Sequence, residues 1–418
     1  MRFLILTQYF APEIGGPQTR LSAIAAELRA LEHEVEVATG IPNYPRGTFF
    51  GGYSSKLYRK DVVDGVTVHR VWLYPAMGGG VKRLLNYLSF TLTSILGMLR
   101  ASKPDYIFVE SPPLFLSIPA YLIAKLRGAR TIFSVADLWP DAIAEGGFIS
   151  KGYAFRRLEQ LEAWSYRRAD YVNAVTEGIR EALLTRKSVP AGKILFLPNG
   201  VDTDRFSPQP EDTELRIRLG LSGKRIILWA GTLGFAHGLD NILESARLLA
   251  SVPDVHFVFV GDGSAKKMLE ERAAELQLRN VTFLDPVANR ELAAYFSIAT
   301  AGLASLADIP LHEGARPSKI FPVLASGKPL IFVGRGEAAR LVAESGAGVV
   351  IPPNDPSALA SAIAELARDP KLARSYGANG RRYVEENLQW SKLISGWVKH
   401  VEVPRTPRGR REAQTAKA

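Results

Sequence analysis

Short apolar runs alternate with helical patterns along the whole chain. In the first half, near-continuous runs of Val, Ile, Leu and Phe predict strands that are buried on both faces, as in parallel sheets. These predicted strands span residues 3–7, 35–39, 66–71, 106–111, 131–137, 171–175 and 194–198. Between the first two lies a helical pattern that opens near Pro17. Its apolar residues share one face and are Leu21, Ile24, Ala25, Leu28 and Leu31.

The second half repeats the alternation. Its predicted strands span residues 226–231, 255–261, 281–285, 300–304, 329–333 and 348–352, with helical patterns at 239–250, 265–276, 291–296, 318–325 and 356–367. Such a pattern predicts parallel sheets with helices on both faces, so we expect two doubly wound α/β domains. Proline, glycine and acidic residues cluster at 198–215, which we interpret as the linker. A last helix over 369–400 precedes a basic tail at 404–418, which we expect to be disordered.

Composition limits the chemistry. The 418 residues carry a formal net charge of +10 and no cysteine, which excludes disulfides, thiolate metal sites and a cysteine nucleophile. No apolar run reaches the ~20 residues needed to cross a bilayer, and the apolar start of the chain is too short for a signal peptide. The basic charge suits nucleic acid or an anionic membrane surface. Since the sequence shows no nucleic-acid-binding motif, we expect no nucleic-acid partner.

Glycine-bearing loops follow several predicted strands. Ligands of open parallel sheets bind beyond the carboxyl ends of the strands, so these loops are candidate sites. After the first strand, Gly15 and Gly16 precede a helix whose free N–H groups suit a phosphate, although a tight turn alone would also explain them. The loop lacks the G-x-G-x-x-G dinucleotide fingerprint, and the chain has no G-x-x-x-x-G-K-[ST] phosphate loop. These absences weaken a nicotinamide or kinase function.

Three further loops in the second half have similar character. Thr232 and His237 lie in a loop after residues 226–231, where His237 either meets a phosphate or caps the turn. Gly261 and Gly263 end the next strand. In the third loop, Pro317 and Ser318 precede Lys319, with Ser318 expected at the N-cap or first position of a helix. A lysine in a first turn opposes the helix dipole, and a bound phosphate would explain it better than a solvated surface position. We therefore expect a diphosphate between the two domains.

Carboxylates at strand ends are the candidates for acid–base chemistry. Asp137 follows the strand at 131–137 and either orients an acceptor hydroxyl or acts as a base, while a capping role is the structural alternative. Glu110 and Glu145 are weaker candidates. The six histidines are scattered without metal-ligand spacing, so we expect no protein-bound metal and no cofactor. The absence of G-x-S-x-G argues against an α/β-hydrolase.

Several motifs together resemble the retaining GT-B glycosyltransferases of family 4 over nearly the full length. They occur in the order of that family and are QYFAPEIGG at 8–16, DLWPD at 137–141, LPNGVD at 197–202 with Phe206, GTL at 231–233, VGDG at 260–263 and ASGKP at 325–329. The DLWPD and PSKIF elements resemble the branch that builds O-antigen, capsule and exopolysaccharide, including N-acetylfucosamine transferases.

This resemblance implies a fold, a reaction and a site. The fold is GT-B, with two Rossmann-like domains facing a cleft, at residues 1–205 and 206–384, and a C-terminal helix at 385–403 crossing back to the first. The reaction moves a sugar from a nucleotide-sugar, with a UDP-linked donor expected, to a lipid-linked or oligosaccharide acceptor with retention. The catalytic candidates are Asp137, Lys319 and Glu313. The substrate-binding candidates are Gly15, Gly16, Asn199, Thr232, His237, Gly261, Gly263, Pro286, Val287, Pro317 and Ser318.

Two departures from the family pattern affect the expected site. Pro322 occupies the place of the second Glu of the E-x7-E pair, which holds the ribose, and Glu313 lies near the place of the first. His237-Gly238 stands where many members have Lys-Gly. A non-catalytic nucleotide-sugar-binding protein and a nucleotide-sugar 2-epimerase on the same fold therefore stay open as alternatives.

Two apolar segments bear on location. Residues 84–99 and 113–126 are rich in Leu, and Lys82, Arg83, Lys125, Arg127 and Arg130 lie around them. They are either buried helices or a basic, partly apolar face that rests on anionic lipid. We expect a cytoplasmic protein that is peripheral on the inner face of the cell membrane.

Overall fold

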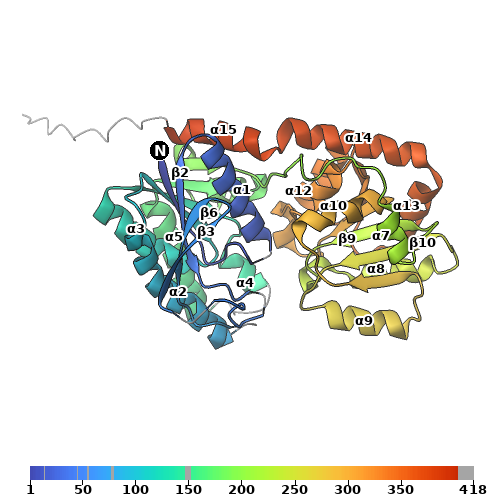
Figure 1. Ribbon diagram of the computed structural model, residues 1–418, viewed down its shortest axis with the longest axis horizontal. Helices are drawn as coiled ribbons and strands as arrows, with labels where there is room; N and C mark the ends of the chain where they lie inside the picture. Colours follow the sequence, from blue (N-terminus) through green and yellow to red (C-terminus); the bar gives the residue numbers. More distant parts are fainter. Residues whose placement is uncertain (14, 45, 54–55, 77–79, 146–151, 403–418) are drawn as a thin grey trace, which may run out of the picture.

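The computed structural model describes residues 1–402 apart from 14, 45, 54–55, 77–79 and 146–151. Two sheets form two domains side by side, and two successive helices, α14 and α15, run along one side of both (Figure 1). One sheet is wholly parallel and the other is parallel except at one edge. The expected fold class, two doubly wound α/β domains, is confirmed. The expected basic tail at 404–418 lies outside the described residues.

The first sheet has the order β3-β4-β2-β1-β5-β6-β7-β8. Its strands are β1 (Arg2–Leu6), β2 (Glu34–Gly40), β3 (Tyr58–Val63), β4 (Val66–Val71), β5 (Tyr106–Ser111), β6 (Arg130–Val135), β7 (Tyr171–Ala174) and β8 (Ile194–Phe196). The chain leaves β1 toward β2 and later returns to add β5 on the other side. This reversal places a topological switch point between β1 and β5, where open α/β sheets bind ligands.

The strand β3 was not predicted from the sequence. It pairs antiparallel with β4 through a two-residue turn at Asp64 and Gly65, both of which have positive φ. Its residues are half-buried or exposed, and Val62 is 68% exposed, so the strand lacks the continuous apolar run of a buried strand. An edge strand of this kind covers one side of a sheet only.

Helices cover both faces of the first sheet. They are α1 (Gly16–Ala30), α2 (Gly80–Arg100), α3 (Ser117–Arg127), α4 (Asp141–Glu145), α5 (Tyr153–Arg168) and α6 (Glu177–Thr185), with short 3-10 turns η1 (Leu114–Leu116) and η2 (Ala191–Lys193). The predicted apolar face of α1 is buried except for Leu31, which follows the end of the helix and is 38% exposed. α1 and α15 (Trp390–Glu402) pack on one face, and α2 and α3 pack on the other.

The second sheet has the order β11-β10-β9-β12-β13-β14 and a switch point between β9 and β12. Its strands are β9 (Arg225–Ala230), β10 (Val255–Val260), β11 (Val281–Leu284), β12 (Ala301–Ser305), β13 (Leu330–Val333) and β14 (Gly348–Ile351). Its helices are α7 (Thr213–Arg218), η3 (Phe235–His237), α8 (Asp240–Leu248), α9 (Lys266–Glu275), α10 (Asn289–Ile298), η4 (Pro310–Gly314), α11 (Ile320–Ala325), α12 (Gly336–Ser345), α13 (Pro356–Arg368) and α14 (Pro370–Asn387).

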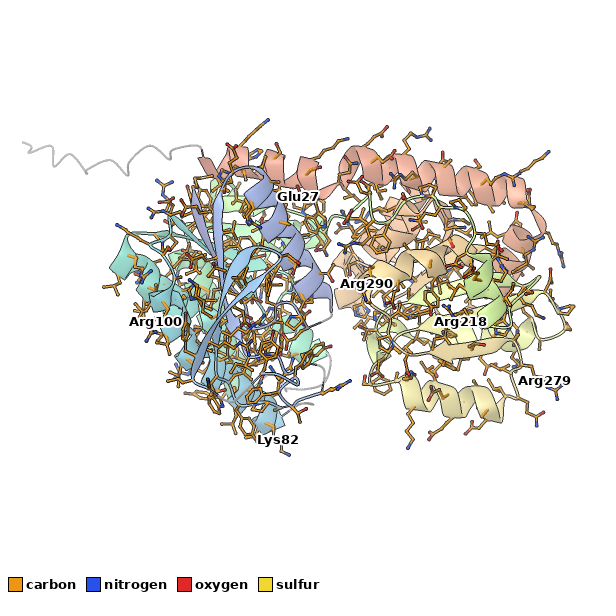
Figure 2. All side chains as sticks on the ribbon, viewed as in Figure 1. Glu27, Lys82, Arg100, Arg218, Arg279 and Arg290 are labelled. Atoms are coloured by element: carbon orange, nitrogen blue, oxygen red, sulfur yellow. The ribbon has the colours of Figure 1, made fainter. Side chains whose placement is uncertain are left out.

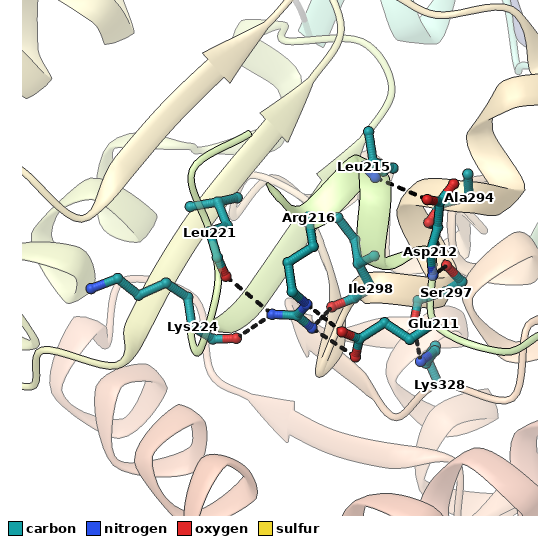
Figure 3. Close-up of polar contacts among 10 residues, drawn as sticks. All are labelled: Glu211, Asp212, Leu215, Arg216, Leu221, Lys224, Ala294, Ser297, Ile298 and Lys328. Atoms are coloured by element: carbon teal, nitrogen blue, oxygen red, sulfur yellow. Dashed lines mark hydrogen bonds and ion pairs between the residues drawn. The ribbon is translucent and has the colours of Figure 1, made fainter. Parts of the chain in front are cut away.

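The acidic residues at the end of the linker have structural roles. Figure 2 shows Glu27 on α1, and burial together with the charges of Asp202 and Asp204 raises its pKa, so α1 lies beside the linker. Farther along, Asp212 caps α7 by accepting a hydrogen bond from the backbone N–H of Leu215, 2.9 Å away. Arg216 pairs with Glu211 and donates to three carbonyl groups (Figure 3). These contacts fix the chain where it enters the second domain.

The expected single helix over 369–400 is two helices. α14 packs on the second domain and α15 on the first, where Trp397 Nε1 donates to Asn173 Oδ1 at 3.0 Å and Tyr106 donates to the carbonyl of Val401. The break falls at Leu388, whose carbonyl accepts from the backbone N–H of Val201 in the linker. Linker and C-terminal segment therefore join the two domains along one side of the molecule (Figure 1).

Candidate functional site

The loops at the two switch points meet at the boundary between the domains. Gly15 is extended, and Gly16 opens α1 directly after β1. A Cβ placed on Gly16 would lie 3.9 Å from Oγ of Ser318, which belongs to the other domain. The N-terminus of α1 thus faces the segment before α11. We call Gly15, Gly16, Ser318, Lys319 and His237 the interdomain site.

Lys319 is the cation of this site. Its ammonium Nζ lies 2.9 Å from Nε2 of His237 and 3.9 Å from the ring centre of the buried Trp229. Its stem lies beside Gly231, where an added Cβ would be 3.6 Å from Cε. No ion pair to Lys319 is formed by any residue that the structure describes. Burial lowers the pKa of Lys319 well below its ordinary value, because neither partner carries a compensating negative charge.

His237 supports Lys319 and carries no charge itself. Burial, followed by the charge of Lys319, lowers the pKa of His237 to about 3. Nδ1 of the ring lies 3.1 Å from the carbonyl oxygen of Ser305, which assigns the proton to Nδ1 and the lone pair on Nε2 to Lys319. Oγ of Ser305 in turn donates to the carbonyl of His237. His237 therefore holds the lysine and offers no positive charge of its own to a phosphate.

The glycines after β10 allow two loops to touch. Gly261 and Gly263 have φ values of +155° and +159°, and a Cβ on either would overlap backbone atoms of the loop after β9. Thr232 in that loop is exposed to solvent. Pro286 is exposed and Val287 half-buried after β11, at the same edge of the sheet. The two glycines are thus explained by the close packing of the two loops, while Thr232 and Pro286 stay accessible to a ligand at this edge.

Asp137 lies on the first-domain side. Its side chain is accessible to solvent, yet protein surrounds it closely enough to raise its pKa, with the negative charge of Glu110 adding to the shift and His312 opposing it. Asp137 therefore lies in a recess that is open to solvent on one side. His312 belongs to η4, which contacts α4 across the domain boundary. Asp137 thus faces the second domain two residues past the end of β6.

A buried ion pair supports this region. Nη1 of Arg20 on α1 lies 2.9 and 2.8 Å from the two carboxylate oxygens of Glu110 on β5. Arg20 is 5% exposed and Glu110 is 2% exposed. Arg20 was missed in the sequence, although it lies four residues before Ile24 on the buried face of α1. A charged residue on the apolar face of a helix indicates a buried partner of opposite charge. The position of Arg20 in the sequence could therefore have indicated this ion pair.

Asn199 and Glu313 form no hydrogen bond or ion pair with Lys319 within the described residues. Asn199 is in the linker, and its neighbour Gly200 packs against Trp390 of α15. Glu313 is exposed and forms no ion pair among the described residues.

The expectation that Ser318 caps α11 or opens it is wrong. Lys319 holds the N-cap position of this helix, and Pro317 and Ser318 both precede it. Pro322 fits the first turn of α11, where a missing N–H costs no helical hydrogen bond.

Comparison with known proteins gives two family matches. Residues 15–200 match the family described as Glycosyl transferase 4-like domain, and residues 211–383 match Glycosyl transferases group 1. The chain is 28% identical over 413 residues to WcaI of Escherichia coli (strain K12), named as a glycosyl transferase of colanic acid biosynthesis. The match covers 96% of this chain and 100% of that protein.

A second relative belongs to Mycolicibacterium smegmatis. It is named as a GDP-mannose-dependent alpha-(1-6)-phosphatidylinositol monomannoside mannosyltransferase, with 26% identity over 412 residues that cover 94% of this chain and 98% of the relative. Among solved structures, sucrose-phosphate synthase of Thermosynechococcus elongatus has a TM-score of 0.75 at 18% identity, covering 95% and 97% of the two chains. WaaG, a glycosyltransferase involved in lipopolysaccharide biosynthesis, has a TM-score of 0.68 at 17% identity, covering 96% and 100%. These structures show the shared fold.

Proposed function

We propose that this chain, which belongs to the family 4 glycosyltransferases of the GT-B fold, takes its sugar from a nucleoside diphosphate donor and transfers it with retention. The two family matches and the named relatives support a role in polysaccharide or glycolipid biosynthesis. In the donor complex, the diphosphate lies between the N-terminus of α1 and Lys319. Gly261, Gly263, Pro286 and Val287 border the base.

The observation that carries this proposal is the pairing of an uncompensated cation with a helix N-terminus across the domain boundary. Within the described part of the chain, the partners of Lys319 are a neutral histidine and an indole ring, and Ser318 beside it faces Gly16. A diphosphate supplies the negative charge that Lys319 lacks, and it accepts from backbone N–H groups at the start of α1, to which Pro17 contributes none. No single domain holds both parts, so the donor is bound only where the domains meet.

The same arrangement favours the chemical step. Negative charge grows on the leaving diphosphate as the glycosidic bond breaks, and fixed N–H groups and an ammonium stabilise that charge. In this proposal the sugar lies beyond the phosphates on the side of Asp137, whose raised pKa suits proton exchange with a hydroxyl group. We propose no covalent nucleophile and no metal for this step.

A donor screen followed by a turnover assay tests the function. Thermal shifts with UDP-, GDP- and ADP-sugars, including N-acetylated amino sugars for the N-acetylfucosamine branch, identify the donor, since one relative is named as GDP-mannose-dependent. Release of nucleoside diphosphate that requires an acceptor supports transfer. Binding without turnover would identify a sensor instead, and interconversion of the donor would identify a 2-epimerase. The anomeric form of the product, read by NMR, tests retention.

The acceptor is proposed to be lipid-linked, because an apolar face with basic residues lies on the first domain. α2 and α3 contact each other and expose a set of leucines, among which Leu92 and Leu126 are each 71% exposed and Leu122 is 54% exposed. The alternative that these two segments are buried helices is therefore only partly correct. Neither helix contains an acidic residue, and Lys82 and Arg100 lie near the ends of α2 (Figure 2). No helix within the described ranges is long and apolar enough to span a membrane.

Vesicle sedimentation tests this membrane contact. Wild-type protein is expected to bind vesicles with anionic phosphatidylglycerol and to lose most of that binding in the triple variant Leu92→Ser, Leu122→Ser, Leu126→Ser. Each leucine contributes roughly 1.5–3 kcal/mol when fully buried in an apolar phase. Ile217→Ser is the matched control, because Ile217 is 63% exposed on the second domain. Equal binding by triple variant and control would exclude this face.

A further inference from the structure

A carboxylate of the second domain caps a helix of the first. Glu337 on α12 is 5% exposed. Its Oε1 accepts from the backbone N–H of Glu177 at 3.1 Å, and its Oε2 accepts from that of Gly178 at 2.8 Å. These are the first two residues of α6, whose N–H groups have no partner within the helix. A negative charge at this helix end is also favoured by the helix dipole.

The backbones of the two domains touch beside this cap. Oγ1 of Thr176, the N-cap of α6, donates to the carbonyl of Gly314 at 2.8 Å. A Cβ placed on Gly178 would overlap the Cα of Gly314, so only glycine permits this approach. The contact between α6 and η4 therefore has steric, hydrogen-bonding and charged components at one spot.

Glu337 also holds the loop that carries Lys319. Nε and Nη2 of Arg316 donate to Oε1 of Glu337 at 2.9 and 2.5 Å, and the Arg316 side chain is 11% exposed. Arg316 precedes Lys319 by three residues in the segment that faces Gly16. One carboxylate thus ties together the first domain, the second domain and the phosphate-facing loop.

We propose that Glu337 is a positioning residue for sugar transfer, which holds the Lys319 loop and the N-terminus of α6 together so that both halves of the interdomain site stay at their working separation. The proposal rests on the proposed nucleotide-sugar site. Removing this link allows the domains to separate, and a diphosphate that needs both domains then binds only in the joined fraction of molecules. The apparent dissociation constant rises in inverse proportion to that fraction.

Two variants break the link from opposite sides. Glu337→Gln keeps the shape but removes the charge and replaces one acceptor by a donor. Gly178→Ala leaves the charge in place but wedges a methyl group against Gly314. Gly178 is the second residue of α6 and has no positive φ, so alanine is not strained in that helix. A loss of function in this variant therefore does not come from backbone strain in the first domain. Gly396→Ala in α15 is the control, since its Cβ would meet nothing within 4 Å.

The separation of the domains is measured directly with spin labels. The chain has no cysteine, so Lys82→Cys and Arg279→Cys create two specific labelling positions. Figure 2 shows them on different domains, on the side of the molecule away from α14 and α15. Pulsed electron paramagnetic resonance then gives the distance distribution, and calorimetry gives the affinity for UDP, GDP or ADP, whichever binds the wild type best.

Both variants are expected to shift the distribution to longer distances and to weaken nucleotide binding by about tenfold, as when one molecule in ten stays joined. Saturating nucleotide should return both to the wild-type distribution. Unchanged distances in both variants, or changed distances with unchanged affinity, would overturn the proposal. If Gly178→Ala changes the distances and the affinity but Glu337→Gln changes neither, the role of the carboxylate is overturned. If no nucleotide binds the wild type, the proposed function fails, while the distances still decide whether Glu337 joins the domains.

Discussion

Replacing Lys319 by methionine tests two separate effects of its charge, one on the stability of the free protein and one on the binding of nucleotide. The ammonium is held against the ring of Trp229 and the neutral ring of His237, and burial lowers its pKa well below the ordinary range. Methionine has a similar length and no charge. We expect Lys319→Met to stabilise the free protein and to weaken its binding of nucleoside diphosphate.

The loss of affinity and the gain in stability have different physical origins. A hydrogen bond from an ammonium to a phosphate contributes about 1.5–3 kcal/mol, which predicts a roughly 10- to 150-fold weaker affinity in the variant. For the free protein, the variant loses a cation–π contact worth about 1–2 kcal/mol but removes a buried charge whose desolvation costs several kcal/mol. The balance favours the variant by about 1 kcal/mol, or roughly 2–4 °C in melting temperature for a domain of this size.

The assay is differential scanning fluorimetry with and without nucleotide, supported by calorimetry. Lys328→Met is the matched control, because burial also lowers the pKa of Lys328, yet this lysine lies before the start of β13 and donates to the carbonyl of Ser297 (Figure 3). A lysine whose pKa is lowered on folding opposes folding less as pH rises, so the stability gain of Lys319→Met should shrink toward pH 10. Wild-type nucleotide affinity in Lys319→Met would refute the assignment of Lys319 to the phosphate.

Proton uptake on binding, independence from metal and the Arg20–Glu110 ion pair can each be tested. The negative charge of a bound diphosphate raises the pKa of Lys319 again. Nucleotide binding should therefore take up protons at pH values between the lowered and the ordinary pKa of this lysine. Calorimetry in buffers of different ionisation enthalpy measures the uptake. Donor turnover should persist after dialysis against a chelator, measured as release of nucleoside diphosphate; lost activity that Mg²⁺ restores would contradict this. Glu110→Gln strands the charge of Arg20, which is 5% exposed, and should lower the free energy of unfolding by about 3–5 kcal/mol in a denaturant titration.

The sequence predicts the fold well because both sheets are buried on both faces. Continuous apolar runs mark such strands, and the strands β1, β5 and β10 lie where those runs are. The edge strand β3 has no such run, but Asp64-Gly65 before β4 is a typical two-residue hairpin turn and could have indicated it. The break between α14 and α15 is set by a contact with the distant linker, and local periodicity contains no trace of such a contact.

The site was predictable in its loops but not in its cross-domain contacts. Glycines after buried strands predict where backbone can approach a ligand, and on that ground Gly16 and Gly261 stay candidates; the structure shows Gly16 opposite Ser318 and Gly261 against Gly231. Glu337, in contrast, is a charged residue in the first turn of an amphipathic helix, a position that ordinary dipole effects already explain. Its partners lie about 160 residues away in the sequence. Only the relative placement of the two domains shows that it caps a second helix.

The departure at His237 has a physical explanation that a charge exchange can test. Where many family members carry lysine, this chain has a neutral histidine, and the ammonium of Lys319 lies 2.9 Å from its ring. Two ammonium groups at this separation would repel, so the cation comes from one position or the other. The double variant His237→Lys, Lys319→Met should therefore regain most of the nucleotide affinity that Lys319→Met loses, whereas His237→Lys alone should lower the melting temperature of the free protein. A double variant that binds nucleotide as weakly as Lys319→Met would show that the position of the charge, and not only its presence, is required.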